Sequence, residues 1–209
     1  MSEYTFPFDT CETPRKKGIA QPYSAFCNLI SCIIIFYFII QTKHLPAFLL
    51  LLSILCFQLV HLFSHCIHIH GYLQMDVIHG LAWVINLTFF YFLYSYTHIW
   101  PSTWFMTFLI SFASFDLFAF CYLPAIFYIG TQSILLSVLL LYYLRYLSKS
   151  IQRIIYYIIV IVGIVTLLLL NEEHNGKRMM AFYPFPYHIF VEISGIILFY
   201  LICSTFYKL

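Results

Sequence analysis

The chain has little charge. Only 9% of its 209 residues are Asp, Glu, Lys or Arg, whereas a soluble globular domain carries about a quarter. This is too little charge to cover a water-facing surface, so lipid must solvate much of the molecule. The net charge is +2, and no run of Lys or Arg is longer than the three residues 15–17. We therefore expect no nucleic-acid partner.

The sequence also lacks a cysteine framework and a cleavable leader. Most of its seven cysteines lie inside apolar runs without a repeated spacing, which is typical of buried small side chains rather than of disulfides or thiolate zinc modules. Residues 1–24 are polar and have no apolar core of the kind found in signal peptides. We expect the first membrane helix to serve as the targeting signal. Without internal repeats or low-complexity linkers, residues 25–209 are expected to form one domain.

Apolar residues dominate the remainder of the sequence. They make up 63% of the chain, the mean hydropathy is +0.91, and aromatic residues reach 21%. A membrane helix needs about 20 mainly apolar residues, and seven segments meet this requirement. The sequence therefore predicts an all-α polytopic membrane protein, a seven-transmembrane helical bundle. The seven segments are residues 25–41, 45–65, 77–96, 104–123, 125–147, 151–171 and 187–207.

The topology places rare polar groups at one depth, although it leaves the orientation open. Basic residues divide five against five between the two sides, so the positive-inside rule does not decide which side faces the cytoplasm. In a seven-span chain, helix 2 ends on the side where helix 1 begins, and helices 3 and 7 begin there too. The polar residues that this arrangement brings into one leaflet are Asn28, Ser64, His68, Asp76, His188 and Glu192, with Asp116 pointing toward the same side.

The spacing of these residues favours a buried metal site. Ser64 and His68 are four residues apart, as are His188 and Glu192, so each pair shares a helix face. Zinc accepts two histidines and a carboxylate in catalytic sites and keeps a fourth position for water. We therefore predict zinc ligands at His68, His188 and Glu192. Asp76 would activate water as a general base, and Ser64 would donate a hydrogen bond.

These residues resemble a known group of membrane proteins. Ser64-x-x-x-His68, an Asp at the next helix start and a His-led four-residue spacing on the seventh helix are similar to the superfamily of seven-span hydrolases that includes alkaline ceramidases and adiponectin-type receptors. The resemblance implies a zinc ion, lipid amide hydrolysis and a membrane-lipid substrate of the sphingolipid kind. It also implies residence in the endoplasmic reticulum or another endomembrane, and a position for Asn28 close to the site.

The chain departs from the pattern of that superfamily in three places. Glu192 stands where the family has a second histidine on helix 7, although glutamate also binds zinc. The gap between His68 and Asp76 is shorter than in alkaline ceramidases. The acidic N-terminal calcium-binding stretch of those enzymes is also missing.

Several residues have a second interpretation. His61, His65 and His68 follow an i, i+4, i+7 spacing, so any of the three could be the ligand. Glu192 could instead be neutral and hydrogen-bonded to a neighbouring helix. Asp116, an additional site candidate, could have a structural role.

Two other groups of polar residues are expected outside the site. Glu172 and Glu173 would form a surface ion pair with Lys177 and Arg178. His79, next to a predicted loop, would lie at the membrane interface.

Two main classes of function remain open. The first is a zinc-dependent hydrolase that acts on a lipid amide or ester from within the bilayer. The second is a non-enzymatic seven-span protein, receptor-like or structural, with a degenerate polar site. A proton or metal-ion transporter is less well supported, because helices 4 to 6 carry few polar residues and a conducting path needs polar groups across the bilayer. The sequence does not fix the oligomeric state.

Overall fold

The structure is a computed structural model. It describes residues 12, 15–67, 72–123, 125–175, 180–182 and 185–207. Within these ranges, side chains are described except for residues 72–75, 125–130, 170, 173–175, 180–182 and 185–186.

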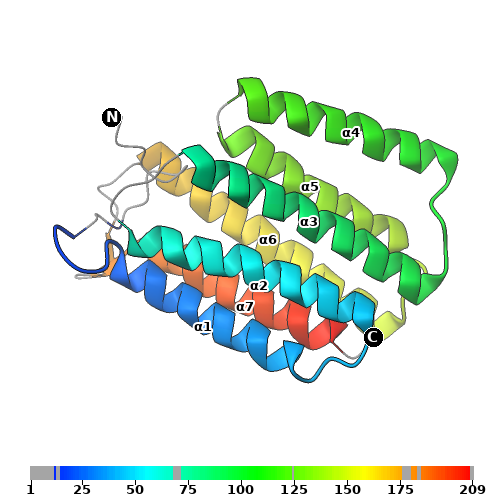
Figure 1. Ribbon diagram of the computed structural model, residues 1–209, viewed down its shortest axis with the longest axis horizontal. Helices are drawn as coiled ribbons and strands as arrows, with labels where there is room; N and C mark the ends of the chain where they lie inside the picture. Colours follow the sequence, from blue (N-terminus) through cyan, green and yellow to red (C-terminus); the bar gives the residue numbers. More distant parts are fainter. Residues whose placement is uncertain are drawn as a thin grey trace.

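The described chain forms seven α-helices that lie side by side, together with one short antiparallel hairpin (Figure 1). The predicted all-α architecture is therefore confirmed apart from this hairpin. The elements are α1 (Pro22–Ile39), α2 (Leu45–Cys66), α3 (Tyr72–Thr97), α4 (Thr103–Tyr122), α5 (Ala125–Leu144), α6 (Lys149–Asn175), β1 (Met180–Phe182), β2 (Phe185–Pro186) and α7 (His188–Phe206).

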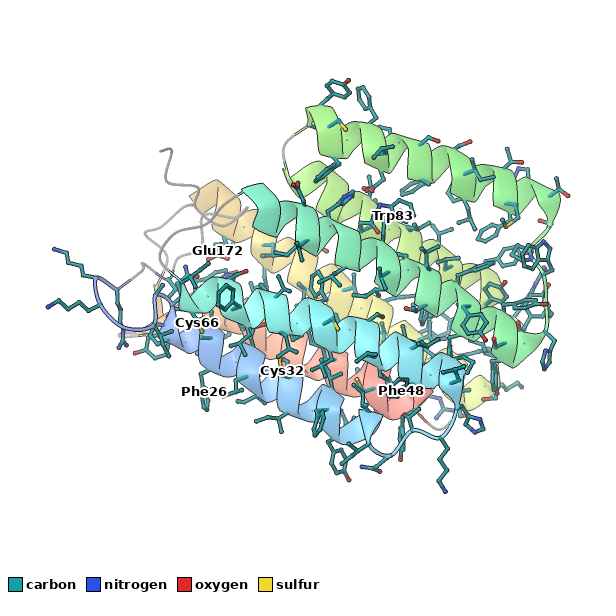
Figure 2. The ribbon with its side chains drawn as sticks, in the orientation of Figure 1. Phe26, Cys32, Phe48, Cys66, Trp83 and Glu172 are labelled. Atoms are coloured by element: carbon teal, nitrogen blue, oxygen red, sulfur yellow. The ribbon has the colours of Figure 1, made fainter. Side chains whose placement is uncertain are left out.

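Six of these helices, α1 to α4, α6 and α7, are long and apolar enough to cross a membrane. The protein is therefore membrane-embedded by the length and composition of its helices. In α5 the described apolar part, Thr131–Leu144, is shorter than a full span, so the count of seven spans stays a prediction. The outer faces are apolar too: Trp104 and Tyr122 on α4 are 74% and 75% exposed, and Phe26 projects from α1 (Figure 2). Lipid is the natural solvent for such a surface.

Local sequence signals explain several helix ends. Proline occupies the first turn of α1 and of α2, where its missing N–H costs no hydrogen bond. Ser102 caps α4, since its Oγ accepts a hydrogen bond from the Phe105 amide at 3.3 Å. In contrast, α6 continues to Asn175, past the predicted end at residue 171, and so includes Glu172 in the helix.

The packing order brings distant parts of the chain together at one end of the bundle. α1 packs between α2 and α7, α2 also packs on α3, α6 packs on α7, and α4 lies outermost against α5 (Figure 1). The starts of α1 and α7 meet the ends of α2 and α6 at this end. Two backbone hydrogen bonds, from Ala20 N to Cys66 O at 3.3 Å and from Gln21 N to His65 O at 2.9 Å, join the residues just before α1 to the end of α2.

Candidate metal centre

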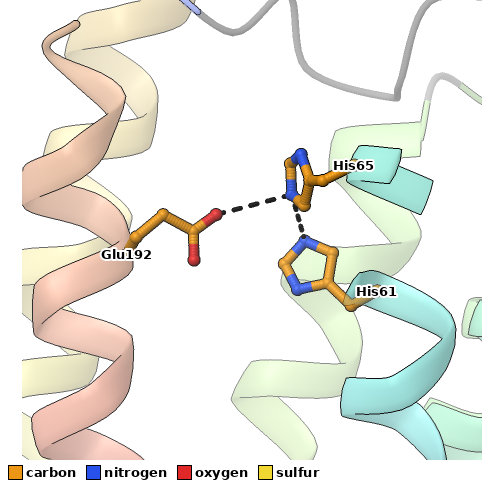
Figure 3. A group of neighbouring side chains, drawn as sticks. All are labelled: His61, His65 and Glu192. Carbon is orange, nitrogen blue, oxygen red and sulfur yellow. Dashed lines mark hydrogen bonds and ion pairs between the residues drawn. The ribbon is translucent and has the colours of Figure 1, made fainter. Parts of the chain in front are cut away.

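Three potential ligand atoms converge at this end of the bundle. His61 and His65 lie one turn apart on α2, and Glu192 faces them from α7 (Figure 3). The two Nε2 atoms are 3.2 Å apart, and His65 Nε2 lies 3.4 Å from Glu192 Oε1. The three ligand atoms all lie within 4.8 Å of one another. Together, His61, His65 and Glu192 could hold a metal ion.

The spacing matches a tetrahedral site. Zinc binds nitrogen and oxygen at about 2.0–2.2 Å, so two ligand atoms on adjacent corners of a tetrahedron are about 3.3 Å apart. The two contacts of His65 Nε2, at 3.2 and 3.4 Å, are close to this edge length. Two of the three edges of the group therefore already match a zinc tetrahedron, and the third lies within 4.8 Å.

The hydrogen bonds of His65 set which ring nitrogen can bind a cation. Its Nδ1 lies 2.6 Å from Gln21 Oε1, and an amide oxygen only accepts, so Nδ1 carries the proton. In the neutral ring, Nε2 then presents its lone pair toward the Glu192 carboxylate. Two such acceptors repel each other unless a cation or a proton lies between them. Gln21 thus leaves His65 Nε2 able to bind a metal ion, in the way that outer partners orient ligand histidines.

His188 lies beside the three-residue group at the start of α7. Its Nε2 is 3.1 Å from Glu192 Oε1, and its Nδ1 is 2.7 Å from Glu172 Oε2. Each ring nitrogen therefore faces a carboxylate. The assignment of His188 as a ligand from sequence stays a prediction, because this geometry also fits a group that transfers protons.

Glu172 corrects one expectation from the sequence. It was expected in a surface ion pair, but it belongs to α6, is 1% exposed and contacts His188. The physical reason is the extra helical turn, which directs the side chain inward. A buried carboxylate needs a hydrogen-bonding partner, and His188 provides it.

The second oxygen of Glu192 is held from α1. Asn28 Nδ2 donates to Glu192 Oε2 at 2.9 Å and to Ser24 O at 2.9 Å. Asn28 Oδ1 in turn accepts a hydrogen bond from Gln58 Nε2. Gln58 Oε1 is buried and has no hydrogen-bond partner among the described residues. A chain of two amides therefore fixes the carboxylate and leaves one free acceptor near it.

The segment before α1 locks the partner of His65 in place. Gln21 Nε2 donates to the backbone oxygen of Glu12 at 2.8 Å. The Glu12 carboxylate accepts hydrogen bonds from the amides of Tyr23 and Ser24, both at 2.9 Å, and from Ser24 Oγ at 2.6 Å. A carboxylate at a helix N-terminus is favoured by the exposed amides and the helix dipole. Glu12 therefore ties Gln21 to the start of α1.

Three other residues predicted for the site are not among the converging ligands. His68 is outside the described residues. Ser64 is buried on α2, and its hydroxyl donates to Val60 O at 2.7 Å. Asp76 lies on α3 with an exposed side chain. No hydrogen bond or ion pair of the described residues joins Ser64 or Asp76 to the three-residue group.

Asp116 belongs to a separate network between α3, α4 and α5. Its carboxylate accepts from His79 Nε2 at 2.8 Å, from Trp83 Nε1 at 2.9 Å and from Gln132 Nε2 at 2.7 Å, and Thr131 Oγ1 donates to its other oxygen. His79 is thus buried rather than at an interface, because its ring serves this carboxylate. With four donors, Asp116 has the features of a structural anchor for α4.

Two of these residues were not singled out from the sequence: His61 was one of three possible ligands, and Glu172 was expected at the surface. The signal for His61 was present, because His61 and His65 repeat the four-residue spacing of His188 and Glu192. No comparable local signal marked Glu172, Gln21 or Gln58, whose contacts depend on tertiary packing.

Comparison with known proteins does not identify a family. No protein-family model, curated protein or solved structure matches the chain. The resemblance to seven-span hydrolases therefore stays a prediction, and the function must be inferred from the chemistry of the site.

Proposed function

We propose that the protein is an integral-membrane, zinc-dependent hydrolase that cleaves a lipid amide or ester. The observation that carries the proposal is the convergence of His61 Nε2, His65 Nε2 and Glu192 Oε1 within a bundle of apolar helices. Polar side chains among membrane helices are costly unless they have a partner or a function. A metal ion would satisfy all three at once.

The ligand types favour zinc among the common metals. Two imidazoles and one carboxylate are a known catalytic set for zinc, with a fourth position left for water. Calcium and magnesium prefer oxygen ligands throughout. When bound, zinc polarises a carbonyl group and lowers the pKa of water to about 7, which supplies a nucleophile for hydrolysis.

His188 and Glu172 provide the proton transfer that hydrolysis needs. Carboxylates lie on both ring nitrogens, Glu172 at 2.7 Å from Nδ1 and Glu192 at 3.1 Å from Nε2, so they hold a proton on each nitrogen. His188 can then give its Nε2 proton to the leaving group and regain it from water. His188 is better placed for this role than Asp76, because its Nε2 contacts Glu192 whereas Asp76 is exposed. The role predicted for Asp76 from sequence is therefore assigned to His188 in this mechanism.

One buried acceptor favours an amide over an ester substrate. Gln58 Oε1 has no hydrogen-bond partner among the described residues, and it lies one helical turn before His61 on α2. An unpaired buried acceptor costs about 1–3 kcal/mol. The N–H of a lipid amide can satisfy this oxygen, whereas an ester has no such donor.

Metal analysis of the purified protein tests the metal centre. We expect about one zinc per chain in the wild type, retained in the exposed-histidine control His44→Ala and lost in His65→Ala. The variant His188→Ala should keep zinc if His188 transfers protons, and should lose it if His188 is a ligand. A wild-type protein without zinc, prepared in zinc-containing medium, would overturn the proposal.

Lipid extracts incubated with the zinc-loaded protein test the activity. The wild type should release a fatty acid that mass spectrometry detects, and Glu172→Gln should release much less while keeping its zinc. A zinc-loaded wild type that releases no fatty acid from any membrane lipid class would contradict hydrolysis and favour the non-enzymatic class.

A further inference from the structure

A cavity of about 180 Å³ lies inside the bundle between α2, α3, α5, α6 and α7. Its walls are mainly apolar and include Ile54, Phe57, Leu136 and Leu198. An apolar cavity of about 150 Å³ stays dry and can hold benzene. The volume therefore fits a segment of a hydrocarbon chain rather than a whole lipid.

The cavity shares α2 and α7 with the metal centre and lies farther toward the middle of the bundle. Phe57 lies one turn before His61 on α2, and Leu198 lies six residues after Glu192 on α7. A lipid whose carbonyl group reaches the metal centre can thus place its chain in this cavity.

Three polar residues, Asn86, Gln132 and Ser133, interrupt the apolar wall, and Asn86 carries an unpaired acceptor. It is 5% exposed, and its Nδ2 donates to Ala82 O at 3.0 Å and to Gln132 Oε1 at 2.6 Å. Its Oδ1 is buried and has no hydrogen-bond partner among the described residues. Leaving such an acceptor unpaired costs about 1–3 kcal/mol, so a ligand that supplies one donor would remove this cost.

A water molecule at this oxygen would leave most of the cavity empty. The polar residues of the wall are Asn86, Gln132 and Ser133, and the rest of the wall is apolar. A hydrocarbon chain that carries a hydroxyl group suits the site, because the chain fills the apolar volume and the hydroxyl donates one hydrogen bond to Asn86 Oδ1.

Building on the proposed hydrolase function, we propose that this cavity receives the acyl chain of the substrate and that Asn86 Oδ1 accepts a hydrogen bond from a hydroxyl group on that chain. The protein then prefers hydroxylated chains over plain ones. Asn86 acts as a specificity-determining residue, and it takes no part in bond cleavage.

The register of α2 and α3 gives the position of that hydroxyl. Ser53 Oγ and Thr88 Oγ1 are 2.9 Å apart, so these residues are level on the two antiparallel helices. Asn86 is then level with Leu55, six residues before His61. At 1.5 Å per residue this is about 9 Å along the axis. The hydroxyl is therefore expected in the middle of the chain, away from the carboxyl end.

A matched pair of fatty acids tests the preference. Oleate and ricinoleate differ only in one mid-chain hydroxyl group, and both carry the carboxylate that the metal centre would bind. Each competes with labelled oleate for the zinc-loaded, full-length protein in nanodiscs. The ratio of their affinities is measured for the wild type, Asn86→Leu and the cavity-narrowing control Leu136→Phe. Partitioning into the bilayer is the same for all three proteins and cancels when the ratios are compared.

We expect the wild-type ratio to favour ricinoleate about 2- to 12-fold more than the Asn86→Leu ratio, which corresponds to one net hydrogen bond. Leu136→Phe should weaken the binding of both fatty acids and keep the wild-type ratio of their affinities. Equal ratios in the wild type and Asn86→Leu would overturn the inference. Zinc content serves as the folding check, and Asn86→Ala replaces Asn86→Leu if the latter loses zinc.

The two proposals fail in different ways. A wild type that holds zinc but shows no preference for the hydroxyl contradicts only the chain specificity. A wild type without zinc contradicts the hydrolase, whichever fatty acid it prefers.

Discussion

Replacing Glu192 with glutamine should abolish tight zinc binding while leaving the helix packing intact. The two side chains have nearly the same shape, and the amide oxygen of glutamine can still accept the hydrogen bond that Asn28 now donates to Glu192 Oε2 at 2.9 Å. What disappears is the negative charge that faces His65 Nε2 at 3.4 Å and His188 Nε2 at 3.1 Å. The substitution thus separates the charge of the ligand from its packing.

The expected loss of zinc affinity follows from the role of the carboxylate as a charged ligand. Loss of an outer partner of a metal ligand lowers metal affinity about 10- to 100-fold. Loss of the charge of a ligand itself should lower the affinity by at least about 100-fold. At a zinc concentration 100 times the wild-type Kd, zinc stabilises the wild type by about 2.7 kcal/mol, and a 100-fold weaker site by about 0.4 kcal/mol. For a chain of this size these values correspond to Tm shifts of about 5–11 °C and below about 2 °C.

Thermal unfolding in detergent, with and without zinc, measures these shifts. Asp116→Asn is the matched control, because it also removes a buried carboxylate but in the separate network of α3, α4 and α5. This control should keep the zinc-dependent shift of the wild type, whatever its own starting Tm. A Glu192→Gln protein that gains as much from zinc as the wild type would refute the assignment of Glu192 as a ligand.

Four substitutions test the surroundings of the centre and the separate network of Asp116. Gln21→Leu should weaken zinc binding about 10- to 100-fold in a competition titration, because His65 Nδ1 loses its acceptor, whereas Gln21→Glu should bind more tightly than Gln21→Leu. Glu172→Gln should slow lipid hydrolysis about 10- to 100-fold with zinc content unchanged, since it alters only the partner of His188. Asp116→Ala should lower the free energy of unfolding by about 3 kcal/mol, because it leaves buried donors unpaired. Denaturant unfolding measures this loss, and the variant should still bind zinc.

The architecture could be predicted from the sequence because membrane helices depend on local composition. Six of the predicted segments reappear as helices long and apolar enough to span a membrane. The helix ends were less predictable. Helix α3 begins at Tyr72, before its predicted segment, and α6 continues to Asn175, after its predicted segment. Polar residues can extend a membrane helix past its apolar part, and hydropathy alone does not detect this.

The site was predictable in region but only partly in its residues. Spacing along α7 identified His188 and Glu192. Spacing along α2 gave three candidate histidines, of which His68, now outside the described residues, was predicted as the ligand. The choice depends on which imidazole faces α7, and this is set by the partners of His65. Gln21 is 44 positions from His65 in the sequence. A contact of this kind arises from packing of α1 against α2 and leaves no local pattern.

The separation of the two buried carboxylate networks has a functional consequence. Glu192 receives one amide donor on Oε2, and its Oε1 faces the histidines at 3.1 and 3.4 Å. Asp116, in contrast, receives four donors, which satisfy both of its oxygens. A carboxylate saturated with donors has little capacity left for a cation, whereas one that faces the lone pair of His65 Nε2 is stabilised by a cation. Hydrogen-bond donors, more than burial, therefore distinguish the carboxylate that anchors a helix from the one prepared to bind a metal.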